Sequence, residues 1–177
     1  MGKKNYLIDG ISGTGKTTVA NELDKLGYHV VHGDRELKYQ GDPKTGKPVV
    51  EPRHKTEMQK TIWLQNHLLW DFKKVKSIIS DHTKNMSFFC GGSRNSEEFI
   101  DLFDGVFVLH VEDINVINQR LDQRTAIDPT DWGAKPEEKE LIAKLHATQA
   151  DIAKSDFIIN ATEPVERVVE QILKKCT

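Results

Sequence analysis

The stretch Tyr-Leu-Ile-Asp-Gly-Ile-Ser-Gly-Thr-Gly-Lys-Thr, residues 6–17, decides the fold of this chain. Within it, residues 10–17 match the pattern of a glycine, four further residues and then Gly-Lys-Thr. An apolar segment, residues 5–9, precedes the pattern, and an amphipathic segment, residues 16–26, follows it. A strand, a glycine-rich turn and a helix in this order are the context in which the pattern forms a phosphate-binding loop.

Such a loop binds phosphate mainly through its backbone. Glycines let successive N–H groups face one anion, and the helix that follows adds the positive end of its dipole. We expect Lys16 to reach the β- and γ-phosphates and the Thr17 hydroxyl to ligate Mg²⁺. The alternative, an exposed lysine beside a helix-capping threonine, is disfavoured by the loop context. The residues expected to bind the nucleotide here are Gly10, Ser12, Gly13, Thr14, Gly15, Lys16, Thr17 and Thr18.

Short apolar runs alternate with helical patterns along the rest of the chain, which is typical of an α/β protein with a parallel sheet between two layers of helices. We expect five buried parallel strands, at residues 5–9, 28–32, 86–90, 106–111 and 157–160. We expect helices at residues 16–26, 56–81, 95–102, 113–124, 137–154 and 164–175. Asp113 can cap one of these helices, and Pro136 and Pro164 can open two others.

Composition limits the size and the partners of the protein. The 177 residues suit one domain, residues 1–177, and the 25 basic and 27 acidic side chains give a net charge of −2. No global positive field is available for nucleic acid or an anionic membrane. The 2 cysteines cannot form a disulfide framework. We therefore expect a cytoplasmic monomer or homodimer without nucleic-acid or membrane partners.

Two large classes of phosphate-loop protein are excluded by missing motifs. A signalling GTPase needs an Asn-Lys-x-Asp motif, and no Asn of this chain is followed by Lys. Motor and remodelling ATPases normally carry an apolar run that ends in Asp-Glu; residues 106–111 are followed by Glu112 and Asp113, in the reverse order. Small kinases remain.

Four further motifs make the chain resemble the nucleotide-kinase-like branch of the phosphate-loop kinases, which includes adenylate, shikimate and gluconate kinases. They are His-Gly-Asp-Arg at 32–35, Cys-Gly-Gly-Ser-Arg at 90–94, Arg-Leu-Asp-Gln-Arg at 120–124 and Asn-Ala-Thr-Glu-Pro-Val at 160–165. The resemblance implies the P-loop NTPase fold, ATP as phosphate donor and Mg²⁺. It also implies an acceptor-binding insertion at about 36–82 and a lid at about 125–136.

The resemblance suggests roles for these motifs, and each role has a simpler alternative. Asp34, at a strand end, is expected to activate the acceptor hydroxyl and to hold Mg²⁺ through water, although it could merely cap a short helix. Arg120 and Arg124 are expected to stabilise the transferred phosphoryl group from the lid, although surface ion pairs with Asp122 and Glu112 are the alternative. The acceptor is expected to contact Asp34, Arg35, Gly91, Gly92 and Arg94, and the nucleotide is expected also to contact Arg120, Ala161, Thr162 and Pro164.

One departure from the pattern bears on the acceptor. Cys90 stands where nucleoside monophosphate kinases usually have Asp, so the metal-water contact is absent or comes from Asp34 or Asp9. This favours a kinase with a hydroxyl acceptor, a nucleoside among the candidates, over a nucleoside monophosphate kinase. A nucleotide-binding regulator with little or no kinase activity is a third hypothesis. Trp63, Trp70 and Phe72 are expected to pack in the core, with an acceptor pocket as the alternative.

Overall fold

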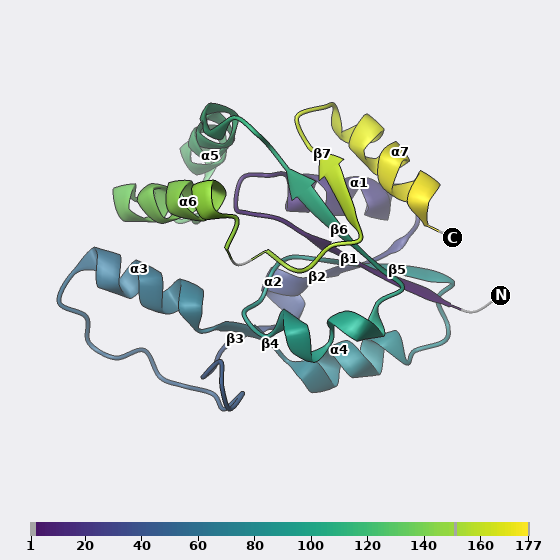
Figure 1. Ribbon diagram of the computed structural model, residues 1–177, viewed down its shortest axis with the longest axis horizontal. Helices are drawn as coiled ribbons and strands as arrows, with labels where there is room; N and C mark the ends of the chain where they lie inside the picture. The colour runs from purple at the N-terminus through teal and green to yellow at the C-terminus, as the bar shows by residue number, and fades with distance from the viewer. Residues whose placement is uncertain (1–2, 151, 177) are drawn as a thin grey trace.

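The computed structural model describes residues 3–150 and 152–176 and has a parallel sheet of five strands at its centre (Figure 1). The strands are β1 (Lys4–Asp9), β2 (His29–His32), β5 (Met86–Cys90), β6 (Gly105–His110) and β7 (Phe157–Asn160). Their spatial order is β2-β5-β1-β6-β7. Because all five strands run in one direction, the segments that follow β1, β2 and β5 meet at one edge of the sheet, where ligands bind in such folds.

Helices cover both faces of the sheet, which confirms the expected three-layer α/β fold. On one face lie α1 (Lys16–Lys25), α5 (Ile114–Ile127) and α7 (Val165–Lys175), and α6 (Pro136–Thr148) packs beside α5 (Figure 1). The other face is covered by α4 (Phe72–Ile79) and the 3₁₀ turns η1 (Ser96–Glu98) and η2 (Ile100–Leu102). Successive residues of β1 point to opposite layers: Tyr6 and Ile8 pack toward α1, and Leu7 packs toward α4.

Several helix ends form as the sequence predicts. The Asp113 side chain accepts the Asn115 N–H and caps α5, Pro136 occupies the first turn of α6, and Pro164 directly precedes α7. Other boundaries were predicted wrongly. Residues 95–102 form two 3₁₀ turns instead of a helix, α5 continues to Ile127, and α6 ends at Thr148. Asp151, inside the helix expected over 137–154, lies outside the described residues.

The single helix expected over residues 56–81 is wrong. The structure has α3 (Glu57–Asn66), a short strand β4 (Leu68–Trp70) and then α4, and β4 pairs antiparallel with β3 (Lys38–Gln40). The break has a local cause, because the Asp71 side chain accepts the N–H groups of Lys73 and Lys74 and starts a new helix there. A short helix, α2 (Gly33–Glu36), links β2 to this two-stranded sheet.

The aromatic residues of this insertion divide between core and surface. Trp70 is fully buried and stacks on Phe99, with ring centroids 5.7 Å apart. Trp63 is partly buried and stacks on His67, whereas Phe72 is 37% exposed, so the expected core packing is confirmed for Trp70 and wrong for Phe72.

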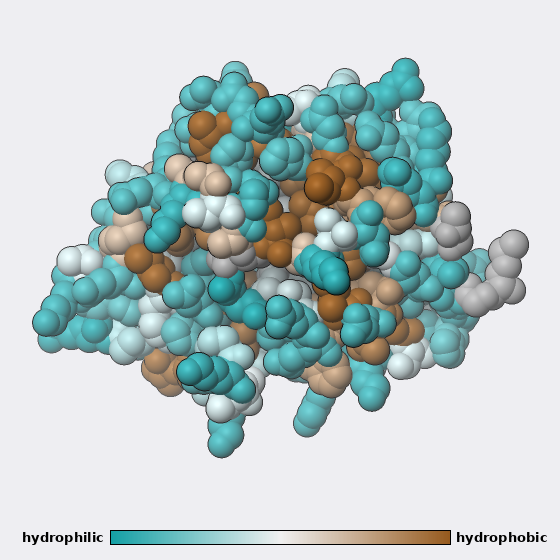
Figure 2. Space-filling model, in the orientation of Figure 1, coloured by the Kyte–Doolittle hydropathy of each residue, from teal (hydrophilic) through white to brown (hydrophobic). Residues whose placement is uncertain are grey.

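Strand β7 also differs from the expectation that both faces of every strand are covered. Ile158 is 70% exposed at the edge of the sheet, and Figure 2 shows apolar surface gathered over β6 and β7. No helix of the described residues is long and apolar enough to cross a membrane.

The loop after β5 is fixed to strand β4 by one buried side chain. Asn95, 4% exposed, accepts the Trp70 N–H at 3.0 Å through Oδ1 and donates to the Trp70 carbonyl at 3.1 Å through Nδ2. The Arg94 N–H donates to the Leu68 carbonyl at 2.8 Å. The segment 91–95 therefore lies along β4 and moves with it.

Replacing Asn95 by Ala should destabilise the protein, because both polar backbone groups of Trp70 then stay buried without a partner. We expect a loss of about 2–4 kcal/mol in the free energy of unfolding, measured by urea denaturation. Asn21→Ala, on the exposed face of α1, is the matched control and should change it by less than about 0.5 kcal/mol. A loss for Asn95→Ala no larger than for the control would contradict this account.

Candidate active site

The loop between β1 and α1 has a backbone that only glycine adopts readily. Gly10, Gly13 and Gly15 all have positive φ, at 148°, 88° and 101°. Space is restricted too: a Cβ on Gly13 would lie 2.7 Å from the Ile117 side chain. No side chain caps α1, which begins after Gly15. Its first N–H groups are therefore open to an anion, and the loop fits the phosphates of a nucleotide.

The Lys16 ammonium lies inside this loop. Its Nζ donates to the carbonyl of Ile11 at 3.0 Å and also to that of Gly10. Burial lowers the pKa of Lys16, and the carboxylates of Asp9 and Asp34 oppose that shift. The expected phosphate-binding lysine is thus at the loop, within the electrostatic reach of two acids.

Asp9 is part of this site, although the sequence suggested it only as one source of the metal-water contact. It is 4% exposed, and its two oxygens accept the Gly10 N–H at 2.7 Å and the Ala153 N–H at 3.0 Å. Burial raises the pKa of Asp9, and the Lys16 ammonium and the two N–H donors lower it. An acid at the end of a strand, directly before the loop, was the sequence signal for it. Asp9 joins the segment after α6 to the phosphate loop.

Asp34 lies beside the loop after β5. It is exposed in the first turn of α2, and its Oδ1 is 3.3 Å from the position a Cβ on Gly91 would take. The alternative role as a helix cap is not observed, because His32 is the N-cap residue of α2 and its N–H donates to Glu36. The Asp34 carboxylate is therefore available to a ligand.

The two glycines after β5 serve close packing. A Cβ on Gly91 would lie 2.8 Å from the Trp70 ring, and one on Gly92 would lie 2.7 Å from Asp9 Oδ1. The acceptor was expected to contact these glycines, and in the structure the Trp70 ring and Asp9 lie against them. Two arginines were expected at the acceptor. Arg35 is exposed beside Asp34, and the exposed Arg94 lies in the loop after β5, which runs along β4.

Arg120 and Arg124 both reach the phosphate loop from α5. Arg120 donates to the Thr14 carbonyl at 3.3 Å and to the Ala161 carbonyl at 2.8 Å. Arg124 donates to Ser12 Oγ at 3.4 Å and to the Trp132 carbonyl. The expected alternative, ion pairs with Asp122 or Glu112, is not what the structure shows: Asp122 pairs with Lys139.

Arg120 also connects the loop to the segment after β7, where the sequence predicted the nucleotide base to lie. Ala161 is buried there, and Thr162 is exposed with its N–H and hydroxyl both donating to Asn160 Oδ1. Pro164 is exposed just before α7. Most of the predicted nucleotide-binding residues thus gather around one loop, including the exposed Thr17 and Thr18 at the start of α1.

Magnesium fits this side-chain set. Mg²⁺ is commonly bound through one or two carboxylates together with substrate phosphates and water. Thr17 offers a hydroxyl at the loop, and Asp34 and Asp9 are the carboxylates near Lys16. Cys90 is buried, and burial raises the pKa of its thiol to about 12, so the thiol stays protonated. Among residues 3–150 and 152–176 no group of three His, Cys, Asp or Glu forms a metal site of protein ligands alone.

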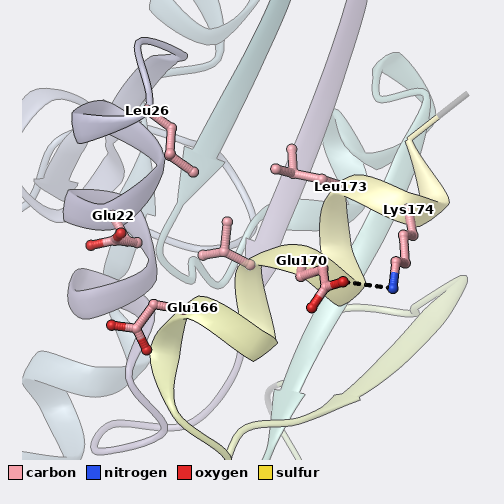
Figure 3. Close-up of a pocket in the computed structure, with 7 residues that line it drawn as sticks. Glu22, Leu26, Glu166, Glu170, Leu173 and Lys174 are labelled. Atoms are coloured by element: carbon pink, nitrogen blue, oxygen red, sulfur yellow. Dashed lines mark ion pairs between the residues drawn. The ribbon is translucent and has the colours of Figure 1, made fainter.

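A hollow elsewhere on the surface is separate from this chemistry. It has a volume of about 490 Å³ and lies between α1 and α7, where Leu26, Val169 and Leu173 line it together with Glu22, Glu166, Glu170 and Lys174 (Figure 3). Glu170 already pairs with Lys174 and Arg167. The hollow is at the end of α1 opposite to Lys16, and none of the predicted site residues lines it.

Comparison with solved structures identifies the fold. The chain is similar to shikimate kinase from Acinetobacter baumannii in complex with shikimate, with a TM-score of 0.57 and 20% identity over 97% of this chain and 92% of that one. A gluconokinase from Sinorhizobium meliloti gives 0.55 and 15% over 97% and 90%. Shikimate kinase from Bacteroides thetaiotaomicron gives 0.52 and 15% over 97% and 96%. The fold is that of the nucleotide-kinase-like P-loop proteins.

Comparison with protein-family models gives no match, and neither does comparison with curated proteins.

The loop geometry predicts that Gly13→Ala is far more harmful than the same change at Gly27, a glycine with a similar φ. Gly27 has φ 86° and nothing within 4 Å of an added Cβ, whereas Gly13 has both the positive φ and the contact with Ile117. Gly27→Ala should cost about 1 kcal/mol of stability and leave nucleotide binding intact. Gly13→Ala should weaken the binding of Mg·ATP at least tenfold, measured by calorimetry. Equal affinities in the two variants would contradict the assignment of the loop.

Proposed function

We propose that this protein is an ATP-dependent kinase that transfers the γ-phosphate of ATP to a hydroxyl group of a small molecule. The observation that carries the proposal is the gathering of three kinds of group at one loop. Lys16 lies within the phosphate loop, Arg120 and Arg124 reach it from α5, and the exposed Asp34 carboxylate lies across from it at the end of β2. Phosphoryl transfer needs cations around the transferred group and an acid–base residue at the acceptor.

In this proposal Asp34 orients the acceptor hydroxyl and takes its proton. The acceptor oxygen forms a bond to the γ-phosphorus, the bond from that phosphorus to the β,γ-bridging oxygen breaks, and ADP leaves. Lys16 and the loop N–H groups hold the β- and γ-phosphates in place. Arg124 neutralises charge that develops on the equatorial oxygens. Thr17, and Asp34 through water, would hold Mg²⁺, which would supply further neutralisation of the phosphates.

The acceptor is proposed to bind between α2 and the loop after β5. Arg35 and Arg94 at this place suit a phosphate or carboxylate on the acceptor, since a guanidinium binds both in a planar fork. The insertion at 36–82 is proposed to supply the rest of the pocket, and the turn within 125–136 is proposed to act as the lid. A nucleoside is one candidate acceptor. We propose a cytoplasmic protein, monomeric or homodimeric.

Two other functions are distinguishable from this one. In a nucleoside monophosphate kinase Arg35 and Arg94 would hold the acceptor's phosphate, and no base would be needed. Protonated Cys90 in place of the usual acid argues against that function. A regulator that binds nucleotide without transferring phosphate is the second alternative, and two arginines fixed at the phosphate loop have no evident use in it.

The proposal is tested by offering the purified protein Mg·ATP with a panel of nucleosides, nucleotides, sugars and hydroxy acids and measuring ADP release and product mass. At least one hydroxyl compound should be phosphorylated. Lys16→Ala should lower that turnover at least about 10²-fold, the effect of losing one preorganised donor. Lys25→Ala, at the exposed end of the same helix, should leave it unchanged. ATP binding without any phosphorylated product would favour the regulator.

Replacing Asp34 by Asn separates a hydroxyl acceptor from a phosphate acceptor. The variant keeps the shape of the side chain and removes its basicity, so kcat should fall by about 10²–10⁴-fold with an unchanged Kd for ATP. Glu36→Gln, which keeps an oxygen to accept the His32 N–H on the same short helix, is the control and should retain kcat. Near-normal turnover of Asp34→Asn would remove Asp34 as the base and favour a nucleoside monophosphate kinase.

A further inference from the structure

The turn between α5 and α6 holds Arg124 and is itself organised by one buried acid. We propose that Glu138 is a positioning residue, which fixes this turn so that Arg124 stays over the phosphate loop. The inference rests on the proposed function only in that Arg124 is taken to act on the transferred phosphoryl group. Among the residues that the structure describes, the Glu138 side chain accepts hydrogen bonds from Gly133 and Lys135 of the turn and not from the phosphate loop.

Arg124 is held from two directions. One hydrogen bond reaches the phosphate loop, at Ser12 Oγ. The other contacts come from the turn: the Trp132 carbonyl accepts a hydrogen bond, and Asp131 Oδ2 lies 3.5 Å from Arg124 Nε. The charge of Arg124 also acts on Lys16, whose pKa it lowers. The guanidinium is therefore near the phosphate site, and the position of residues 131–132 decides where it lies.

Glu138 fixes that part of the turn. It is 9% exposed, and its Oε2 accepts the Gly133 N–H at 2.7 Å and the Lys135 N–H at 3.2 Å. Gly133 has φ 102°, and a Cβ there would lie 2.8 Å from Leu121, so the turn packs closely on α5 at the residue next to Trp132. Without the carboxylate, two N–H groups of the turn would lose their acceptor, and the chain that follows Trp132 would be free to shift.

Both N–H groups donate to the same oxygen of Glu138, so two substitutions of this residue can test its role as an acceptor. A glutamine has one carbonyl oxygen and can accept both hydrogen bonds, whereas an alanine can accept neither. If Glu138 acts by accepting these bonds, Glu138→Gln should keep the turn and Glu138→Ala should lose it. Glu137 is the matched control, since it is the neighbouring acid in the first turn of α6 and no hydrogen bond of its side chain joins the turn.

The kinetic test is a double-mutant cycle on the most active acceptor. Glu138→Ala should lower kcat by about 10- to 10²-fold, the cost of misplacing a catalytic group by about 1 Å. The same change in an Arg124→Ala background should lower kcat by less than about twofold, because the residue it positions is already gone. Glu138→Gln and Glu137→Ala should retain kcat within about threefold. Equal losses from Glu138→Ala in both backgrounds, or a Glu138→Gln as impaired as Glu138→Ala, would overturn the proposal.

A second measurement reports on Arg124 without catalysis. The solvent exchange of the Arg124 Nε–H signal, followed by ¹⁵N NMR on the full chain, should become at least about tenfold faster in Glu138→Ala and stay unchanged in Glu138→Gln. Unchanged exchange in Glu138→Ala would overturn the proposal even if the protein is an active kinase. Faster exchange in a protein that phosphorylates nothing would support the positioning role and count against the proposed function, so the two failures are distinguishable.

Discussion

The site depends on a helix start that no side chain caps. The chain leaves β1 at Asp9, turns through three glycines with positive φ and enters α1 without a capping side chain. A helix start of this kind is normally stabilised by a Ser, Thr, Asp or Asn side chain. Here that position is kept open, and an anion is the natural partner. The surrounding residues either hold the loop in this shape or bring charge to it.

Two long-range contacts hold the loop against its neighbours in space. Asp9 accepts N–H groups from the loop and from the segment after α6, and Arg120 donates to carbonyls of the loop and of the segment after β7. Both side chains use charge to bind main-chain groups, which gives stronger hydrogen bonds than neutral side chains give. Through them, segments more than a hundred residues apart in sequence take up fixed positions around the same phosphate site.

The sequence predicted the parts of this fold that depend on local pattern. The phosphate loop is a near-contiguous motif with a strand before it and a helix after it, and the apolar runs of the five strands are distinct from the helical segments. The two-stranded sheet of β3 and β4 was missed because Leu68, Leu69 and Trp70 also fit a helical pattern. The Asp71 cap starts a new helix after them, and Asn95, in a loop 25 residues away, satisfies the backbone of Trp70 in the strand. Single-sequence periodicity carries no information about such a partner.

The candidate site was predictable to a similar extent. The residues within motifs, such as Lys16 and Arg120, lie where the pattern predicts them. Asp9 and Glu138 were not assigned, although each had a signal: an acid directly before the loop, and a glutamate three residues after the residue that precedes α6. Their roles follow from which distant N–H groups they accept, and that is a property of tertiary structure. The same holds for Gly91 and Gly92, because the close approach of Trp70 and Asp9 to them is also a property of tertiary structure.

The acid–base and cationic groups of the site belong to different structural units. Asp34 stands on a single helical turn beside Gly91, and Gly91 lies against the buried Trp70 that Asn95 fixes to the following loop. Arg124, in contrast, is held by two half-buried residues of the turn between α5 and α6, Asp131 and Trp132. The salt bridge from Lys135 to Glu57 joins that turn to α3 of the insertion, and both its partners are exposed, so it adds little stability. The exposed Asp34 carboxylate therefore stands next to the buried Trp70, whereas Arg124 depends on contacts with one short turn.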